Sequence, residues 1–181
     1  MYDPLCNARA SRETLTALCL SAFVMLCGAT STASTANAVA TSTTFDSASK
    51  TVLLSVQAAG VQIYECRANE AGLLTWTFRE PLAILMSDGE TVGRHFRGPS
   101  WQLNDGGKVV GKVVAQKPGA SEKDITLLHL DVSDREGTDL LTRAIAIERV
   151  DTHGGAFAGL CQQTGELHLE PYSARYVFFA D

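Results

Sequence analysis

Two arginines, a histidine and a tryptophan lie close together in RHFRGPSW, residues 94–101. In an extended strand alternate side chains share a face, so His95 and Arg97 point to one side and Arg94 to the other. A histidine beside an arginine can hold a carboxylate or a phosphate through paired hydrogen bonds. Trp101 can form the floor of such a site by stacking on the ligand. The residue types therefore predict a ligand-binding corner made of Arg94, His95, Arg97 and Trp101.

A structural interpretation of the same corner stands beside this one. His95 can bond to a neighbouring strand, the arginines can be solvated, and Trp101 can belong to the core. Loops next to sheet corners often carry function, but most residues there support the fold. A concave pocket at His95, Arg97 and Trp101 would favour ligand binding, or an enzyme if a carboxylate lies within hydrogen-bond reach. A filled core would favour the structural interpretation.

Acid–base catalysis is the rival chemistry. His95 with a carboxylate such as Glu65 has the residue types that a hydrolase or lyase would use as acid and base. The chain contains no G-x-S-x-G and no H-E-x-x-H motif, so no known catalytic signature supports this alternative.

The spacing of the histidines does not indicate a metal site. The four histidines are His95, His129, His153 and His168, and no two of them are separated as in H-x-H or H-x-x-x-H. Metal sites favour such spacings or a nearby cluster of further ligands. We therefore predict no metal and no other cofactor.

The N-terminus has the pattern of a secretory signal peptide. Arg9 and Arg12 precede an apolar run at residues 15–29, which is short for a membrane span. Two overlapping A-x-A patterns follow and predict cleavage after Ala38 or Ala40. An N-terminal membrane anchor is the alternative. We expect a signal peptide at 1–38, a flexible segment at 39–50 and a single all-β domain at 51–181, exported to the periplasm or the exterior.

Export changes the meaning of the cysteines. Three of the five cysteines lie in the segment to be removed, which leaves Cys66 and Cys161. An even pair in an oxidising compartment predicts one disulfide. The alternatives are a metal site and two buried free thiols.

The net charge of the chain is mildly acidic, at −5. An acidic domain has no electrostatic reason to bind nucleic acid or an anionic membrane. We therefore expect no nucleic-acid partner, and the mature chain has no further apolar run long enough for a membrane span. The charge leaves the ligand and the oligomeric state open.

Beyond residue 50 the chain consists of short β-rich runs separated by turn residues. The clearest turn is NDGG, residues 104–107, and Asp88-Gly89 is a second one. The run at 140–150 alternates and is predicted as a strand, whereas 115–124 and 151–165 are predicted as long Gly- or Pro-containing loops. This pattern predicts an all-β fold, an antiparallel sandwich or barrel.

Six ordered motifs resemble one known family. They are LLSVQAAGVQIYECRA, W.F..P.A.L, G..VG.HF.GPSW...DGG.V.G, I..V.T.GG, a cysteine, and Y.A.Y.F, and they span about Thr51 to Phe179. The family is the exported domain of unknown function 3455, DUF3455. Some members carry a malate dehydrogenase label, but this chain has no G-x-G-x-x-G motif opening a helix. The resemblance implies the fold and export, and no activity.

These observations predict an exported, disulfide-stabilised β-domain that binds a small or polymeric ligand near residues 94–101. A secreted hydrolase or lyase that uses His95 with a carboxylate is one alternative. A structural envelope or stress protein without a pocket is the other.

Overall fold

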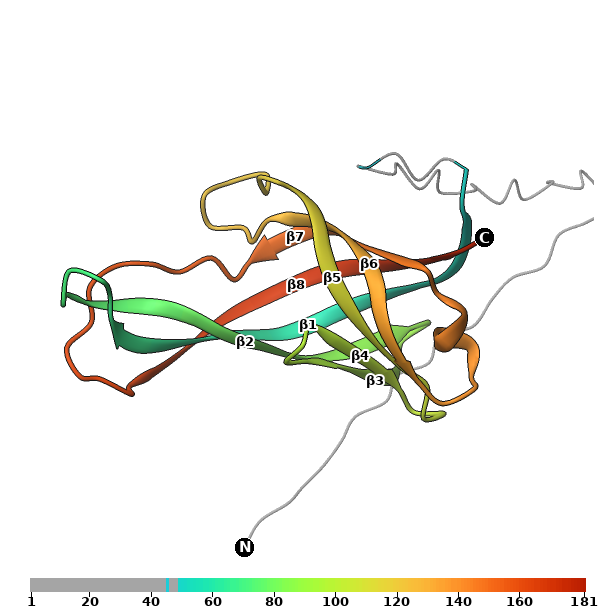
Figure 1. The fold of residues 1–181 in the computed structure, drawn as a ribbon, viewed down its shortest axis with the longest axis horizontal. Coiled ribbons are helices and arrows are strands. Elements are labelled where there is room, and N and C mark those ends of the chain that lie inside the picture. The colour runs from blue at the N-terminus through green and yellow to red at the C-terminus, as the bar shows by residue number, and fades with distance from the viewer. Residues whose placement is uncertain (1–44, 46–48) are drawn as a thin grey trace, which may run out of the picture. The chain divides into compact units, whose positions relative to one another are not determined.

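The structure is a computed structural model and describes Phe45 and residues 49–181 (Figure 1). The predicted signal peptide at 1–38 and most of the predicted flexible segment at 39–50 lie outside the described residues. The elements in chain order are β1 (Thr51–Ala68), β2 (Leu74–Ser87), β3 (Glu90–Phe96), β4 (Ser100–Leu103), β5 (Lys108–Lys117), β6 (Leu127–Glu136), the 3-10 helix η1 (Leu140–Arg143), β7 (Ala146–Gly154) and β8 (Leu167–Ala180).

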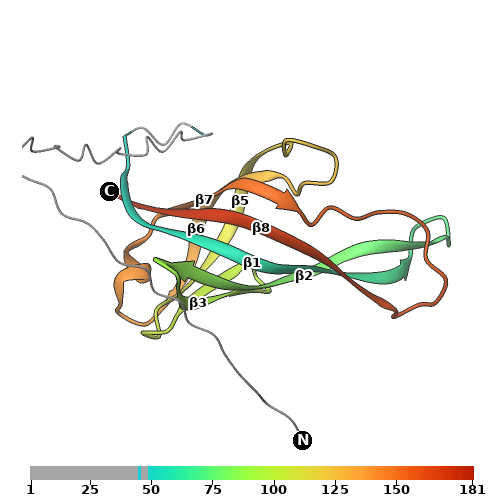
Figure 2. The same cartoon turned by 180° about the vertical axis from the view of Figure 1, so that it is seen from behind.

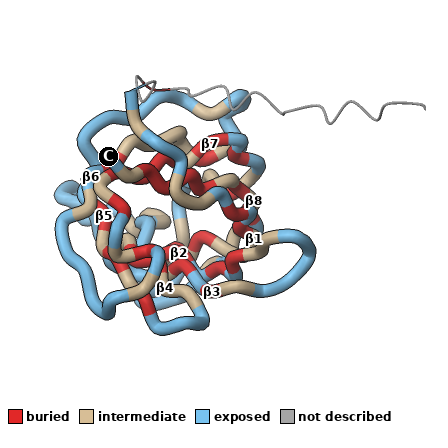
Figure 3. The backbone as a smooth tube through the Cα atoms, turned by 90° about the vertical axis from the view of Figure 1, so that its right-hand side faces the viewer, coloured by how far each residue is buried: buried red, intermediate tan, exposed pale blue. Residues whose placement is uncertain are grey.

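The strands form one antiparallel sheet that closes on itself. Each strand pairs with the next along the chain, and β8 pairs with β1. Figure 3 looks along the strands and shows them arranged round a ring in chain order. The predicted all-β antiparallel fold is confirmed, and of the two architectures left open by the sequence the pairing forms the barrel. No helix among the described residues is long and apolar enough to cross a membrane.

Three strands are longer than the turn signals predicted. β1 has 18 residues and β2 and β8 have 14 each. The sequence favours two separate β-rich runs here, TVLLSV at 51–56 and VQIYECR at 61–67, but they form one strand. Gly60, which has no side chain, lets β1 lie close to β2 between them. The end of β1 from Val61, the start of β2 to Leu82 and the start of β8 to Pro171 pair with one another. This three-stranded part, here called the arm, extends beyond the other strands (Figures 1 and 2).

Both predicted tight turns are confirmed. Asp88 and Gly89 join β2 to β3 with φ of 51° and 84°, the left-handed conformations that a two-residue hairpin turn requires. The NDGG turn joins β4 to β5, where the Gly107 amide donates to Asp105 Oδ1 at 3.0 Å. Between these two turns, the corner at residues 97–99 joins β3 to β4, which pair with His95 opposite Trp101.

The strand predicted over residues 140–150 is wrong in its first part. Leu140–Arg143 form the 3-10 helix η1, and the strand begins only at Ala146. The Thr142 hydroxyl donates to the carbonyl of Asp139 at 2.7 Å and holds the turn. Leu141 is fully buried in the core beside Gly107, which precedes β5. The helix therefore covers the end of the barrel where β5 begins.

The barrel interior is filled by apolar side chains that alternate along the strands with outward ones. The largest fully buried members are Trp101, Tyr176, Phe178, Leu85, Leu130 and Ile147. A second, smaller buried cluster comprises Ala146, Val150, Val177 and Phe179, which alternate with the interior residues of β7 and β8.

Candidate functional site

A cavity of about 770 Å³ lies at the end of the barrel opposite η1. Its wall comes from the arm, the corner that follows β3, the end of β5, β7 and the loops at 118–126 and 155–166. Its size falls within the range of about 300–1,000 Å³ that is typical of small-molecule sites.

Two of the four predicted corner residues line this cavity. They are His95 and Arg97, which share a strand face as the alternation predicted. Arg94 does not line it, because its guanidinium donates to Gln102 Oε1 at 2.7 Å on the exposed side of β3. The Arg94 guanidinium also lies 5.0 Å from the ring centre of Phe96. The side of β3 that faces the interior is therefore that of His95.

Trp101 does not line the cavity either, since it lies in the core behind His95. Its exposed fraction is 1%. The two rings are stacked, with centroids 4.6 Å apart and planes 14° apart. Tyr176 packs against both rings, with its centroid 4.9 Å from that of His95 and 5.2 Å from that of Trp101. Trp101 thus supports the His95 ring from within the core.

The hydrogen bond of His95 determines its tautomer. Nδ1 lies 2.9 Å from the carbonyl oxygen of Ser100, and a carbonyl only accepts, so Nδ1 carries the proton. Burial lowers the pKa of His95 from 6.5 to about 3, against a smaller opposite effect of the Ser100 hydrogen bond. The ring is therefore neutral at physiological pH, and its Nε2 is an acceptor.

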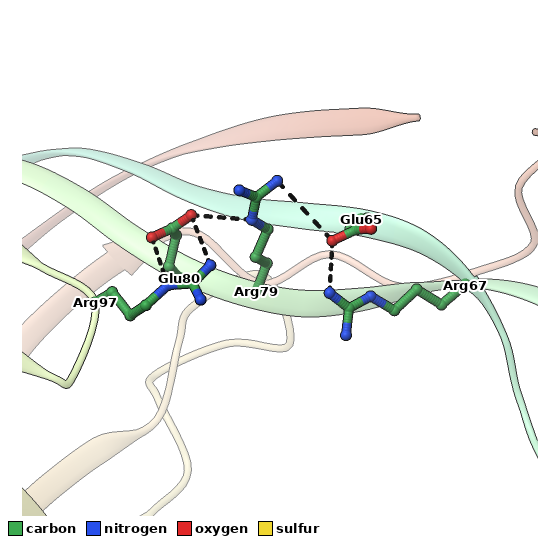
Figure 4. Close-up of polar contacts among 5 residues, drawn as sticks. All are labelled: Glu65, Arg67, Arg79, Glu80 and Arg97. Carbon is green, nitrogen blue, oxygen red and sulfur yellow. Dashed lines mark hydrogen bonds and ion pairs between the residues drawn. The ribbon is translucent and has the colours of Figure 1, made fainter. Parts of the chain in front are cut away.

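Arg97 belongs to a chain of ion pairs at the cavity wall, shown in Figure 4. Its Nε and Nη2 donate to the two carboxylate oxygens of Glu80 at 3.0 and 3.2 Å. The Arg79 Nε also pairs with Glu80, at 3.0 Å. Hydrogen bonding from Arg97 is the main reason why the pKa of Glu80 lies below its usual value. The charge of this carboxylate is thus compensated twice.

The same chain continues away from the cavity to Glu65. The Glu65 carboxylate accepts a hydrogen bond of 2.6 Å from Arg67, and Arg79 Nη1 lies 3.9 Å from it. This hydrogen bond from Arg67 is the main cause of the lowered pKa of Glu65. Glu65 does not line the cavity. The structure therefore does not bring the predicted acid–base pair of His95 and Glu65 together.

Arg149 is a cation that the sequence reasoning missed. It lies on β7 opposite Tyr176 and lines the cavity from the barrel interior. Its Nε donates to the Thr126 carbonyl at 2.9 Å, and its Nη2 donates to the Thr126 hydroxyl at 3.2 Å. No carboxylate of the described residues lies within ion-pair distance of this half-buried guanidinium. A signal was present, because Arg149 alternates with Ile147 and so shares the core face of a predicted strand.

Further polar groups in the interior have no hydrogen-bond partner among the described residues. They include the side-chain amide nitrogen of Gln62, which lines the cavity, the hydroxyls of Tyr172 and Tyr176, and the indole nitrogen of Trp101, which does not line it. The two tyrosines lie near each other and near Arg149, but their contacts lack hydrogen-bond geometry. Burial raises the pKa of both phenols, so both stay protonated.

The loop at 155–166 is fixed against the arm and closes one side of the cavity. Tyr64 donates its hydroxyl hydrogen to the Gly155 carbonyl at 2.7 Å and accepts from the Phe157 amide at 3.2 Å. The Phe157 ring stacks on His168 with centroids 3.6 Å apart. The predicted disulfide between Cys66 and Cys161 is confirmed and joins β1 to this loop.

The remaining histidines do not gather. His129 lies 3.4 Å from Glu148, and His168 lies 2.8 Å from Glu170, while His153 is exposed. Among the residues that the structure describes, no group of three or more His, Cys, Asp or Glu side chains is arranged to hold a metal ion.

The fold and the cavity define a closed antiparallel β-barrel with polar groups inside one end. The chain belongs to the family described as protein of unknown function DUF3455, whose family model matches residues 47–180. The resemblance seen in the sequence motifs is thereby confirmed. No curated protein and no solved structure matches the chain significantly.

Proposed function

We propose that the domain is an exported module that binds a small ligand, or the end of a polymeric one, in the cavity. The observation that carries the proposal is a space of about 770 Å³ that reaches polar side chains inside the barrel. Protein interiors are otherwise close-packed, and a buried polar group without a partner is costly. A ligand that supplies partners for Gln62 and Arg149 accounts for both features.

The chemistry of His95 favours binding over a hydrolase or lyase. Its hydrogen-bond partner is a backbone carbonyl and not a carboxylate. With a pKa of about 3 the ring accepts a proton poorly near neutral pH. Among the carboxylates of the cavity wall, Glu80 is held by two arginines. The cavity itself favours binding over a purely structural role in the envelope.

Export to the periplasm or the exterior is supported by two independent features. One is the signal-peptide pattern of residues 1–38. The other is the disulfide between Cys66 and Cys161, since such bonds persist in oxidising compartments.

A thermal-shift screen of small molecules tests whether ligands bind in the cavity. We would compare the wild-type protein with Val113→Trp and Val114→Trp. Both valines are exposed, at 44% and 50%, but only Val113 lines the cavity. We expect compounds that raise the Tm of the wild type and of Val114→Trp, and not that of Val113→Trp, because the new indole occupies the site. Equal responses of the two variants would contradict the proposal.

A further inference from the structure

Arg149 presents a free binding edge to the cavity. Its Nε and one Nη2 hydrogen are used by Thr126. A guanidinium has five N–H donors in one plane. The edge formed by Nη1 and the second Nη2 hydrogen makes no hydrogen bond of standard geometry among the described residues, and the Tyr176 phenol is its polar neighbour. This edge has the geometry that binds a carboxylate or phosphate through two parallel hydrogen bonds.

The cavity lining is balanced in charge, but the charges differ in their environment. Arg79, Arg97 and Arg149 are matched by Glu80, Glu122 and Asp124. Glu80 is neutralised by Arg79 and Arg97. Asp124 accepts hydrogen bonds from Ser121 and from the Gly154 amide, and those from Ser121 are the main cause of its lowered pKa. Glu122 is exposed to solvent. Of the three cations in the lining, Arg149 is the one without an ion-pair partner among the described residues, and it lies on the barrel side.

A second residue of the cavity lining has a donor without a partner. The side-chain amide nitrogen of Gln62 is buried without a partner, and the residue is only 2% exposed. Gln62 lines the cavity together with Arg149. A half-buried cation without an ion-pair partner and a buried amide donor without an acceptor are both costly. Both are satisfied at once by an acceptor that carries negative charge.

The rest of the wall suits an apolar body. Phe78, Val113, Leu128 and Phe157 line the cavity. Phe78 and Phe157 each pack edge-on against Tyr64, with centroids 5.8 and 5.9 Å apart. The volume accommodates a ligand of ordinary small-molecule size.

We propose that the cavity takes an amphipathic ligand whose oxyanion is held by Arg149 and Gln62 and whose apolar body lies along the aromatic and aliphatic wall. This inference rests on the proposed function and adds the class of ligand to it. The oxyanion is a carboxylate or a phosphate monoester, since both match the fork of an arginine.

Matched probes separate the charge from the apolar body. We would titrate the protein by calorimetry at about pH 7 with octanoate and naphthoate, with their neutral amides, and with octyl and naphthyl phosphate. We expect at least one oxyanion to bind about tenfold or more tighter than the amide of the same body, because hydrogen bonds to a charged group contribute more. The carboxylate and phosphate arms identify the oxyanion, and the octyl and naphthyl arms identify the body.

Variants then assign the preference to Arg149. We expect Arg149→Met to bind oxyanion and amide with equal affinity, and Arg149→Lys to keep a reduced preference because lysine lacks the fork. Arg175→Met is the matched control, since Arg175 pairs with Asp151 and does not line the cavity. If Arg149→Met does not fold, the wild-type comparison and Arg149→Lys decide the question.

The outcomes distinguish the two proposals. Equal binding of oxyanions and amides by the wild type would overturn the ligand class and leave a binding cavity in place. An oxyanion preference that survives in Arg149→Met would overturn the role of Arg149. Failure of every probe, together with a thermal-shift screen without hits, would overturn the binding function itself.

Discussion

His95 and Arg149 line the same cavity, but His95 is neutral and Arg149 is positively charged. Burial keeps His95 neutral, whereas the guanidinium of Arg149 remains charged at any physiological pH. The neutral imidazole offers an acceptor at Nε2, and the arginine offers donors. At the scale of single residues the site can therefore read both the charge and the hydrogen-bonding pattern of a ligand.

The neutral state of His95 predicts how stability depends on pH. The folded-state pKa of about 3 lies below the ordinary value of 6.5. Between these values the unfolded chain binds a proton that the folded protein does not, so stability is complete above pH 6.5 and declines as the pH falls. The contribution of His95 between pH 7 and 4.5 is on the order of 2–3 kcal/mol.

Urea unfolding at these two pH values measures the effect. We expect His95→Gln to lose less stability than the wild type on acidification, because the glutamine does not titrate. The comparison concerns the change with pH and not the absolute stability, since the variant also loses the stack on Trp101. An equal decline in both proteins would contradict the prediction.

The alternation of side chains along a strand predicted the facing of some site residues but not of others. It placed His95 and Arg97 on one face, and both line the cavity. It could not show that Trp101 lies behind His95, because the stack depends on the pairing of β3 with β4. Arg149 was missed because a charge on an apolar face becomes informative only when the sheet is known to close around it.

At the scale of elements, the arm and the two loops form the part of the barrel that a ligand would contact. β2 pairs with β3 only from Ala83 onward, and the loop at 159–161 bonds to its first residues, so the edge on that side is the stretch between them, residues 77–82. Pro81 lies in this edge, where its missing amide hydrogen costs no ladder bond. The cavity wall includes the same part of β2. The sheet is thus left unpaired where the cavity lies.

The passage of β1 into the arm depends on Gly60. An added Cβ there would collide with the Leu82 carbonyl oxygen and the Ala83 backbone of β2. We expect Gly60→Ala to destabilise the protein by roughly 1–3 kcal/mol, the usual cost of overpacking, as measured by urea unfolding. Ala59→Ser adds one heavy atom at the half-buried neighbouring position and should cost less. A Gly60→Ala variant as stable as Ala59→Ser would contradict the prediction.

Local sequence signals predicted the turns but not the extent of the strands. Asp88-Gly89 and NDGG were identified because their residues tolerate positive φ. The full length of β1 was not predicted, because Gly60 lies between its two runs and a glycine usually marks a break. The 3-10 helix was missed because the burial of Leu141 at the barrel end is a tertiary contact. Closure of the barrel depends on β1 meeting β8, the most distant pairing in the domain.

At the scale of the whole molecule, the net charge is negative, whereas the cavity lining includes the cation of Arg149. The chain carries a net charge of −5, which by itself disfavours the approach of an anion. The ion pairs of the cavity wall neutralise the carboxylate of Glu80 near the site. Screening over about 8–10 Å at physiological salt weakens the distant charges further. An acidic protein can therefore still present a positive site to a ligand.

The disulfide joins two segments of the described chain that are far apart in the sequence. It joins residues 95 positions apart and so closes a loop over most of the described chain. Cys66 lies in β1, and Cys161 lies in the loop that carries Phe157 of the cavity wall. The disulfide therefore stabilises the fold by restricting the whole unfolded chain. At the site it holds only the loop at 155–166.

We expect native protein recovered after export to contain no free thiol until it is denatured and reduced. Reduction should lower the free energy of unfolding by about 4–5 kcal/mol, the value that the chain-entropy model gives for a loop of this length. Urea unfolding of the oxidised and reduced forms of the same chain measures the difference without changing any side chain, and a thiol titration of the native protein confirms the starting state. Two reactive thiols in the native protein, or a difference of only tenths of a kilocalorie, would show that the bond does not constrain the fold.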